Sequence, residues 1–175
     1  MQHIFKFFHQ RNVEHDENTG ERISNTLFLG FFSSEEKCKE LIPNYIKQPG
    51  FKDYPDDFII EKEEADVDDF NDIAGNFDSM VFYLYHEWYD GKYDNITDLG
   101  CYSTRELAEK AMENYRNKDP MFTEKPDDFL IDEFIIDKDV CWEDGFYTWE
   151  EIDQYDKENN IAQGEEYKKS LFDKE

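Results

Sequence analysis

The sequence is poor in basic residues and contains no long apolar run. Its 175 residues carry 19 Lys and Arg against 44 Asp and Glu, which gives a formal net charge of −25. Proteins that bind nucleic acids or anionic membranes neutralise phosphates with clustered Lys and Arg, so this balance argues against direct binding of either. Apolar runs of only a few residues predict no membrane-spanning segment. Residues 1–20 lack the continuous apolar stretch of a secretory signal, and we therefore expect a cytoplasmic protein.

Cysteine is also scarce. The three cysteines are Cys38, Cys101 and Cys141. An odd number without close spacing predicts neither a disulfide framework nor a zinc-binding set. Reduced thiols are the simpler interpretation, and they agree with a cytoplasmic location.

Complete metal and cofactor motifs are absent as well. Two acidic segments, Asp66–Asp69 and Asp137–Asp139, are spaced like the opening of an EF-hand loop. That loop needs Gly at its sixth position and Glu at its twelfth, and both segments lack both residues. We interpret them as solvated turns and expect no cofactor and no dedicated metal site, with adventitious divalent binding left open.

Charge and aromatic side chains are abundant together. Charged residues make up 36% of the chain and aromatic residues 17%. Disordered, solvating segments contain few aromatic residues. The composition therefore predicts a folded, acidic protein.

The strongest pattern in the sequence is an internal repeat. Three pairs of segments match at offsets of 77, 70 and 71 residues: Ile4–His9 with Val81–His86, Leu29–Ser34 with Leu99–Thr104, and Pro55–Phe58 with Pro126–Phe129. Two copies are too few for a solenoid. We therefore predict two pseudo-equivalent repeats, residues 1–77 and 78–146, followed by a C-terminal extension, residues 147–175.

Each copy is predicted to fold as strand, strand, helix, strand. The strands are rich in aromatic and β-branched residues, and the first two in each copy are separated by the turn residues Asp16–Gly20 or Asp90-Gly91. The predicted strands are Ile4–His9, Thr26–Phe32 and Phe58–Glu64 in the first copy, and Val81–His86, Ile96–Tyr102 and Phe129–Ile136 in the second. This order predicts an α+β fold with antiparallel sheets.

Capping signals mark the start of both helices. Ser33-x-x-Glu36 and Ser103-x-x-Glu106 match the capping box, in which a serine oxygen and a glutamate satisfy free amides of the first turn. Apolar residues then recur at helical spacing. Pro43 is expected to kink or break the first helix because it removes an amide donor.

The extension after residue 146 gives weaker signals. Tyr147–Tyr155 predicts a short helix, and Lys157–Glu175 predicts a charged tail.

Motifs of known catalytic chemistry are missing. The sequence has no glycine-rich phosphate loop, no G-x-S-x-G elbow and no H-E-x-x-H helix. His9 and His86 occupy equivalent repeat positions, and we interpret both as structural. A nucleophilic pair of His86 with Cys101 is conceivable, but the first copy has Phe31 in place of that cysteine. We expect no enzymatic activity.

Two sets of residues are candidates for binding a partner. Aromatic side chains next to a carboxylate are typical anchors of protein interfaces, and such a set comprises Tyr83, Tyr85, Trp88, Tyr89 and Asp90, with Trp142 further along. The second set is the carboxylates of two proline-led turns, Asp56, Asp57, Asp127 and Asp128. These aspartates also suit a tight turn by accepting amide hydrogen bonds, and this structural interpretation is favoured.

The repeat unit resembles a family of small uncharacterised bacterial domains. The family pattern runs L-G-x-[YF]-S-[ST]-x-E, then P-G-F, then W-x-x-G-F; here Leu99–Glu106 carries the first part, Pro49–Phe51 the second, and Trp142 with Gly145-Phe146 the third. Each copy departs from the pattern in a different place, since the first lacks the tryptophan and the second has Met121 for the glycine. The resemblance implies an accessory protein similar in character to immunity proteins of bacterial toxin systems, and it implies no catalytic residue.

These observations favour a non-enzymatic, acidic protein that neutralises a basic protein partner, as a toxin-immunity protein does. The electrostatic field of its net negative charge would steer the cationic surface of a partner towards the protein. One alternative is a phage or mobile-element DNA mimic that inhibits a nucleic-acid-binding or defence protein, with carboxylates in place of phosphates. A structural accessory domain with a soluble surface is a third possibility.

Overall fold

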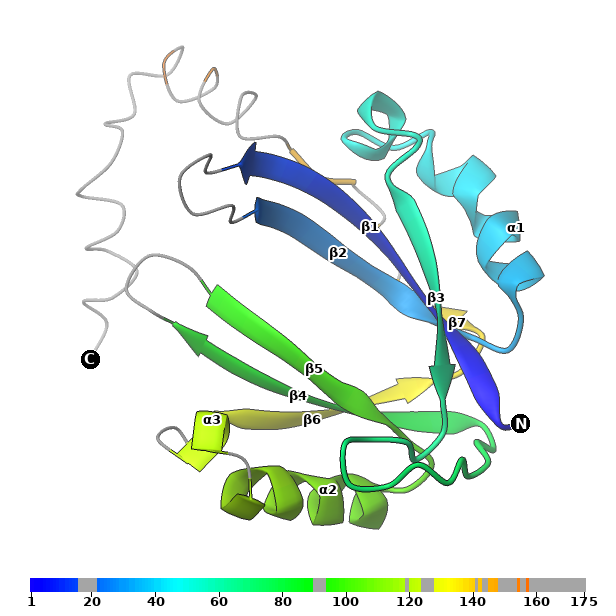
Figure 1. Ribbon diagram of the computed structural model, residues 1–175. Coiled ribbons are helices and arrows are strands. Elements are labelled where there is room, and N and C mark those ends of the chain that lie inside the picture. Colours follow the sequence, from blue (N-terminus) through cyan, green and yellow to red (C-terminus); the bar gives the residue numbers. More distant parts are fainter. Residues whose placement is uncertain are drawn as a thin grey trace, which may run out of the picture. The chain divides into compact units, whose positions relative to one another are not determined.

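The chain folds as an α+β protein with two antiparallel sheets (Figure 1). The computed structural model describes residues 1–15, 22–89, 94–118, 120–123, 128–140, 142, 145–147, 154 and 157. Contacts divide the chain into two units, one formed by residues 1–43 with 56–141 and the other by residues 44–55 with 142–175. Both sheets lie in the first unit.

The first sheet has the strand order β3-β1-β2-β7. Its strands are β1 (His3–His15), β2 (Arg22–Phe32), β3 (Phe58–Glu64) and the short β7 (Lys138–Asp139). Strand β1 is central, with Phe5 opposite Phe32 of β2 and opposite Lys62 of β3. The predicted strand positions are confirmed, and the first hairpin is longer than the sequence pattern indicated. The predicted turn Asp16–Gly20 lies outside the described residues.

The second sheet has the order β5-β4-β6 and is covered on one face by a helix. Its strands are β4 (Met80–Tyr89), β5 (Asp94–Tyr102) and β6 (Phe129–Ile135), and the helix α2 (Arg105–Lys118) is followed by the short α3 (Pro120–Thr123). Central β4 pairs with both neighbours. The predicted turn Asp90-Gly91 lies outside the described residues.

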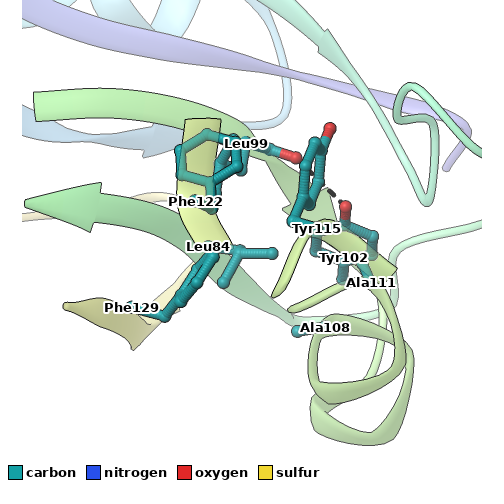
Figure 2. Close-up of a cluster of buried hydrophobic side chains, with 8 residues drawn as sticks. All are labelled: Leu84, Leu99, Tyr102, Ala108, Ala111, Tyr115, Phe122 and Phe129. Atoms are coloured by element: carbon teal, nitrogen blue, oxygen red, sulfur yellow. Dashed lines mark hydrogen bonds between the residues drawn. The ribbon is translucent and has the colours of Figure 1, made fainter. Parts of the chain in front are cut away.

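A cluster of buried side chains joins this sheet to α2 (Figure 2). We call it the helix-side cluster; its members are Leu84, Leu99, Tyr102, Ala108, Ala111, Tyr115, Phe122 and Phe129. The helix contributes residues at positions i, i+3 and i+7, which lie on one face of an α-helix. Helical spacing in the sequence placed Leu107 and Met112 on this face as well; Met112 packs against the cluster, whereas Leu107 is 36% exposed.

A second cluster contains residues from both sheets. We call it the inter-sheet cluster; its members are Ile4, Phe31, Ala65, Phe77, Val81, Cys101 and Ile136. The ring of Phe31 in β2 lies 5.7 Å from that of Tyr83 in β4 and 5.5 Å from that of Phe134 in β6. The two sheets thus share one set of buried contacts.

Two aspartates in a left-handed backbone conformation connect the sheets reciprocally. Asp66 follows β3 and has φ 63°, and its carboxylate accepts hydrogen bonds from the backbone N–H (2.7 Å) and the hydroxyl (2.8 Å) of Ser103. Asp137 follows β6, has φ 67°, and accepts from the N–H (2.8 Å) and hydroxyl (2.9 Å) of Ser33. Burial tends to raise the pKa of Asp137, but hydrogen bonds from Lys37 and Ser33 outweigh it and lower that pKa below its usual range.

These contacts correct the predicted helix caps by one residue. The helices begin at Glu35 and Arg105, and the capping oxygens belong to Ser34 and Thr104, which accept from the amides of Lys37 (3.3 Å) and Leu107 (3.2 Å). The preceding serines bind the aspartates from the other sheet instead. The serines that the local pattern assigned to the caps therefore bind carboxylates that are distant in the sequence.

The first helix continues through its proline. Helix α1 (Glu35–Tyr45) contains Pro43 and ends two residues later, whereas α2 runs for 14 residues. The predicted break near Ile42 does not occur, since the helix continues through Pro43 and ends at Tyr45, whereas a kink there stays a prediction. Pro43 lacks the N–H that would bond to the carbonyl of Lys39 one turn back, so the last turn of the helix lacks one backbone hydrogen bond.

In the second unit, two glycines bring distant segments together. Gly50 and Gly145 have φ of 78° and 71°, and a Cβ on Gly145 would lie 2.3 Å from the carbonyl oxygen of Pro49. The rings of Phe51 and Phe146 lie 4.9 Å apart. Of the predicted C-terminal helix and tail, only Tyr147, Gln154 and Lys157 are described residues.

Candidate partner-binding surface

The predicted aromatic set is divided between two faces of β4. Tyr83 packs against the inter-sheet cluster, whereas Leu84 belongs to the helix-side cluster. Because side chains alternate along a strand, Tyr85 lies on the face of Tyr83, and Trp88 lies on the opposite face. Tyr89, at the end of the strand, is 51% exposed, and Asp90 lies outside the described residues.

Tyr83 takes part in a charged network between the sheets. The Nζ of Lys6 in β1 donates to the Tyr83 hydroxyl (2.9 Å), lies 4.6 Å from the centre of its ring, and forms an ion pair with Asp98 of β5. Burial, more than the nearby charges, raises the pKa of Tyr83 above its ordinary value. This tyrosine is therefore a neutral donor and acceptor that links the sheets.

Tyr85 extends the same network. Its ring stacks on that of Tyr83 at 5.3 Å, and its hydroxyl donates to Asp132 (3.1 Å). Burial and the charge of Asp132 raise the pKa of Tyr85 to about 12. Both tyrosines therefore already have partners within the chain, which limits their use as anchors for another protein.

Two of the predicted turn aspartates, Asp57 and Asp128, directly precede β3 and β6. The carbonyl oxygens of Asp57 and Asp128 accept from the amides of Gln10 (2.9 Å) and Glu87 (3.0 Å), which extends each ladder by one bond. The Asp56 side chain is exposed, and Asp127 lies outside the described residues. The backbone of both turns thus has a structural role, while the exposed carboxylate remains accessible to a partner.

Trp142 is half-buried and belongs to the second unit, whereas Tyr83, Asp57 and Asp128 belong to the first.

The nucleophilic pair considered from the sequence does not form. His86 lies with Phe122 and Phe129 of the helix-side cluster, at ring distances of 4.9 and 4.8 Å. Cys101 belongs to the inter-sheet cluster, on the other face of the sheet. Burial raises the pKa of the Cys101 thiol well above its ordinary value and that of Cys38 to about 12. Neither thiol is a thiolate at neutral pH, and a thiolate is the reactive form.

The described residues form an open, acidic pocket on the surface of the first unit. It has a volume of about 380 Å³ and is formed by β3, β5, the segment after β3, and the helices α2 and α3. Its four charged lining residues are all carboxylates: Glu63, Asp68, Asp69 and Asp98. Within the described part of the chain no lysine or arginine lines it, so the pocket favours a cation.

Of the residues predicted to bind a partner, none that the structure describes lines this pocket. In the sequence, Asp68 and Asp69 belong to a segment spaced like the opening of a calcium loop, which we interpreted as a solvated turn. Glu63 and Asp98 carry no motif, and they come together because β3 lies near β5. No local pattern in the sequence predicts that two strands of different sheets will lie near each other.

Glu63 is the carboxylate whose ionisation is most altered. Its half-buried side chain is next to Asp98, Lys6 and Glu61. Burial is the largest cause that raises the pKa of Glu63 to about 7, the charge of Asp98 adds to the rise, and Lys6 partly offsets it. This glutamate therefore changes charge close to neutral pH.

The change Glu63→Gln should remove a pH dependence of stability. A carboxyl with a raised pKa contributes stability that is complete below its unfolded pKa, about 4.5, and is lost as the pH rises through about 7. Because the group is partly exposed, screening reduces the effect, and we expect the wild type to lose about 1–2 kcal/mol across this range relative to the variant. Urea unfolding at a series of pH values measures this difference.

The exposed neighbour Glu64 offers a matched control, since Glu64→Gln makes the same chemical change on the same strand. That variant should follow the wild-type pH profile. A constant difference between wild type and Glu63→Gln at every pH would contradict the assigned environment of Glu63.

Among the described residues, no group of three or more His, Cys, Asp or Glu side chains is arranged to hold a metal ion. In the same part of the chain, no helix has both the length and the apolar character needed to cross a membrane.

Comparison of the chain with protein-family models, with curated proteins and with solved structures found no match.

Proposed function

We propose that the protein is a non-enzymatic, acidic binding protein that neutralises a basic protein partner, in the manner of a toxin-immunity protein. The observation that carries this proposal is the acidic pocket, with four carboxylates and no described basic residue in its lining, on a chain with a net charge of −25. Opposite charge on a partner would speed encounter and favour the correct orientation.

The proposed setting is the cytoplasm of a bacterium. The reduced cysteines support it, because buried thiols with raised pKa values stay chemically inert there. The resemblance of the sequence pattern to immunity-like accessory domains supports the same setting.

We also propose that the two ββαβ segments are copies of one unit. Equivalent hydrogen bonds support this: Asp66 N–H to the Cys101 carbonyl (2.9 Å) corresponds to Asp137 N–H to the Phe31 carbonyl (2.8 Å). His9 and His86 are both buried and face Phe58 and Phe129 respectively. A duplicated unit would give the protein two similar helix-covered sheets.

A second candidate function is mimicry of DNA. The observation that favours it is the spread of acidic residues through the whole chain, since a mimic needs carboxylates at phosphate-like intervals along an extended face. Under this alternative the partner would be a nucleic-acid-binding protein, and the exposed Asp56 would belong to the binding face.

The two functions are distinguished by competition. The full chain is used to capture its partner from a lysate of the source organism, and the purified partner is then bound in the presence of duplex DNA. At constant salt, an immunity-type complex of the chain with its partner should persist in excess DNA. If the chain is a DNA mimic, the DNA should displace it from the partner. Recovery of no basic protein in repeated captures would contradict both functions.

A further inference from the structure

We propose that the outer edge of β6, the side that faces away from β4, binds an extended basic segment of the partner as an added strand of the second sheet. This inference rests on the proposed function and names the structure that the partner must present. It depends on three features of the edge: backbone groups without a partner strand, exposed apolar side chains, and charged side chains that are all acidic.

The backbone of β6 has one row of polar groups that no strand of the described residues pairs with. In the second sheet β6 pairs with β4 alone (Figure 1). The N–H of Glu87 donates to the carbonyl of Asp128 (3.0 Å), and the N–H of Ile136 donates to that of Ser79 (2.9 Å). Because these groups alternate in direction along a strand, the even-numbered residues of β6 bond to β4. The odd-numbered residues direct their N–H and C=O groups outward.

This edge is less protected than the other sheet edges of the fold. Sheets commonly protect their edges with lysine, proline or a bulge, and β6 contains no lysine, arginine, proline or glycine and has no register shift in its ladder with β4. In β5, by contrast, Gly100 lies near a register shift. By the same alternation, the outward positions of β3 include Lys62 and Glu64, where β6 has Glu133 and Ile135 at an offset of 71 residues.

Exposed apolar side chains lie on both faces of β6. Leu130 is 41% exposed and lies opposite Tyr85 of β4, and Ile135 is 51% exposed. An added strand would cover part of both side chains, and apolar pairs across a ladder stabilise a sheet. In this mode of binding, the backbone hydrogen bonds supply affinity and alternate side chains supply specificity.

The charges of β6 indicate which kind of strand can pair with it. Asp132 and Glu133 are exposed and point to opposite faces. Asp132 uses Oδ2 to accept from the Tyr85 hydroxyl, and Glu133 uses Oε1 to accept from Arg105. The second oxygen of each carboxylate accepts no bond from the described residues.

These carboxylates favour a basic strand over a second copy of the chain. Opposite charges across a ladder stabilise it, and like charges destabilise it. Another copy would bring the same acidic strand and a further net charge of −25. A segment of alternating apolar and basic residues meets both the apolar and the acidic side chains of β6.

The test uses the full chain and an acetylated, amidated heptapeptide of alternating valine and lysine at low ionic strength. Amide hydrogen exchange, measured by NMR, follows binding at each residue. The edge variant is Glu133→Pro, which removes an outward N–H and keeps the bonds of β6 to β4. The matched control is Glu133→Gln, which removes the same charge and keeps that N–H. Spectra of the variants show whether each is folded, and Ile135→Pro with the control Ile135→Ala is a second pair should Glu133→Pro fail to fold.

Binding should change the exchange of alternate residues. At saturating peptide, the amides of Ile131, Glu133 and Ile135 should exchange at least about five-fold more slowly, because they gain a partner strand. The amides of Leu130 and Asp132 should change little, since they already bond to β4. Glu133→Pro should bind the peptide at least about five-fold more weakly than Glu133→Gln, the usual effect of one lost hydrogen bond. A peptide with glutamate in place of lysine should not bind.

Three other results would overturn the inference. Equal affinities of the two Glu133 variants without slower exchange at the outward amides, or binding of hexa-lysine alone, would exclude the edge and leave the proposed function intact. Absence of binding by either cationic peptide would overturn both. Slower exchange in the chain alone as its concentration rises, lost in Glu133→Pro, would show that a second copy, and not a basic partner, occupies the edge.

Discussion

Replacing Phe31 by alanine should lower the free energy of unfolding by about 3–5 kcal/mol, the usual cost of removing a buried phenylalanine. Phe31 is fully buried and contacts rings of three strands, Phe28 in β2, Tyr83 in β4 and Phe134 in β6. The surrounding rings are fixed in two sheets and cannot collapse into the space. Chemical denaturation measures the loss.

The same variant shows whether the two sheets unfold together. Amide hydrogen exchange should become faster in β4 as well as in β1, since both sheets depend on the inter-sheet cluster. Leu107→Ala, at a position 36% exposed on α2, should cost less than about 1 kcal/mol and serves as the control. Faster exchange in the first sheet alone would contradict a shared core.

The second large effect is expected at Asp66. The change Asp66→Ala should destabilise the protein by about 2–4 kcal/mol, because it leaves the partly buried Ser103 amide without its charged acceptor and places alanine in a left-handed conformation. Asp66→Asn should lose about half as much, since asparagine tolerates that conformation and keeps an oxygen acceptor. Thermal and urea unfolding of the two variants give both values.

A double-mutant cycle with Ser103→Ala separates the two causes. If the hydrogen bonds dominate, Asp66→Ala should cost much less in the Ser103→Ala background than in the wild type. The exposed Asp72 provides the control, and Asp72→Ala should change stability by less than about 0.5 kcal/mol. Additive losses in the cycle would contradict the bonding between Asp66 and Ser103.

The elements of this fold were largely predictable from local patterns. The strands follow aromatic and β-branched runs, and the buried face of α2 follows the spacing of Ala108, Ala111 and Tyr115. The helix caps were misplaced because Ser33 and Ser103 bind aspartates more than 30 residues away in sequence. A local motif cannot indicate which distant acceptor competes for the same side chain.

The candidate site was much less predictable. Tyr83, Tyr85 and Trp88 are close in sequence, but the two-residue period of a strand sends the tryptophan to the other face. The carboxylates of the pocket are brought together by the approach of β3 to β5, and through that approach the charge of Asp98 adds to the effect of burial in raising the pKa of Glu63. Composition predicts the sign of the partner's charge. The candidate surface that would bind the partner could be identified only from the tertiary structure.

The proposed function depends most directly on attraction between this acidic chain and a basic partner. The decisive measurement is therefore the affinity of the full chain for its captured partner, determined by calorimetry at a series of salt concentrations. Salt screens such attraction, so affinity should fall steadily as salt rises, and it should fall less steeply for the Glu63→Gln, Asp69→Asn variant. An affinity that is unchanged between low and high salt would contradict the account.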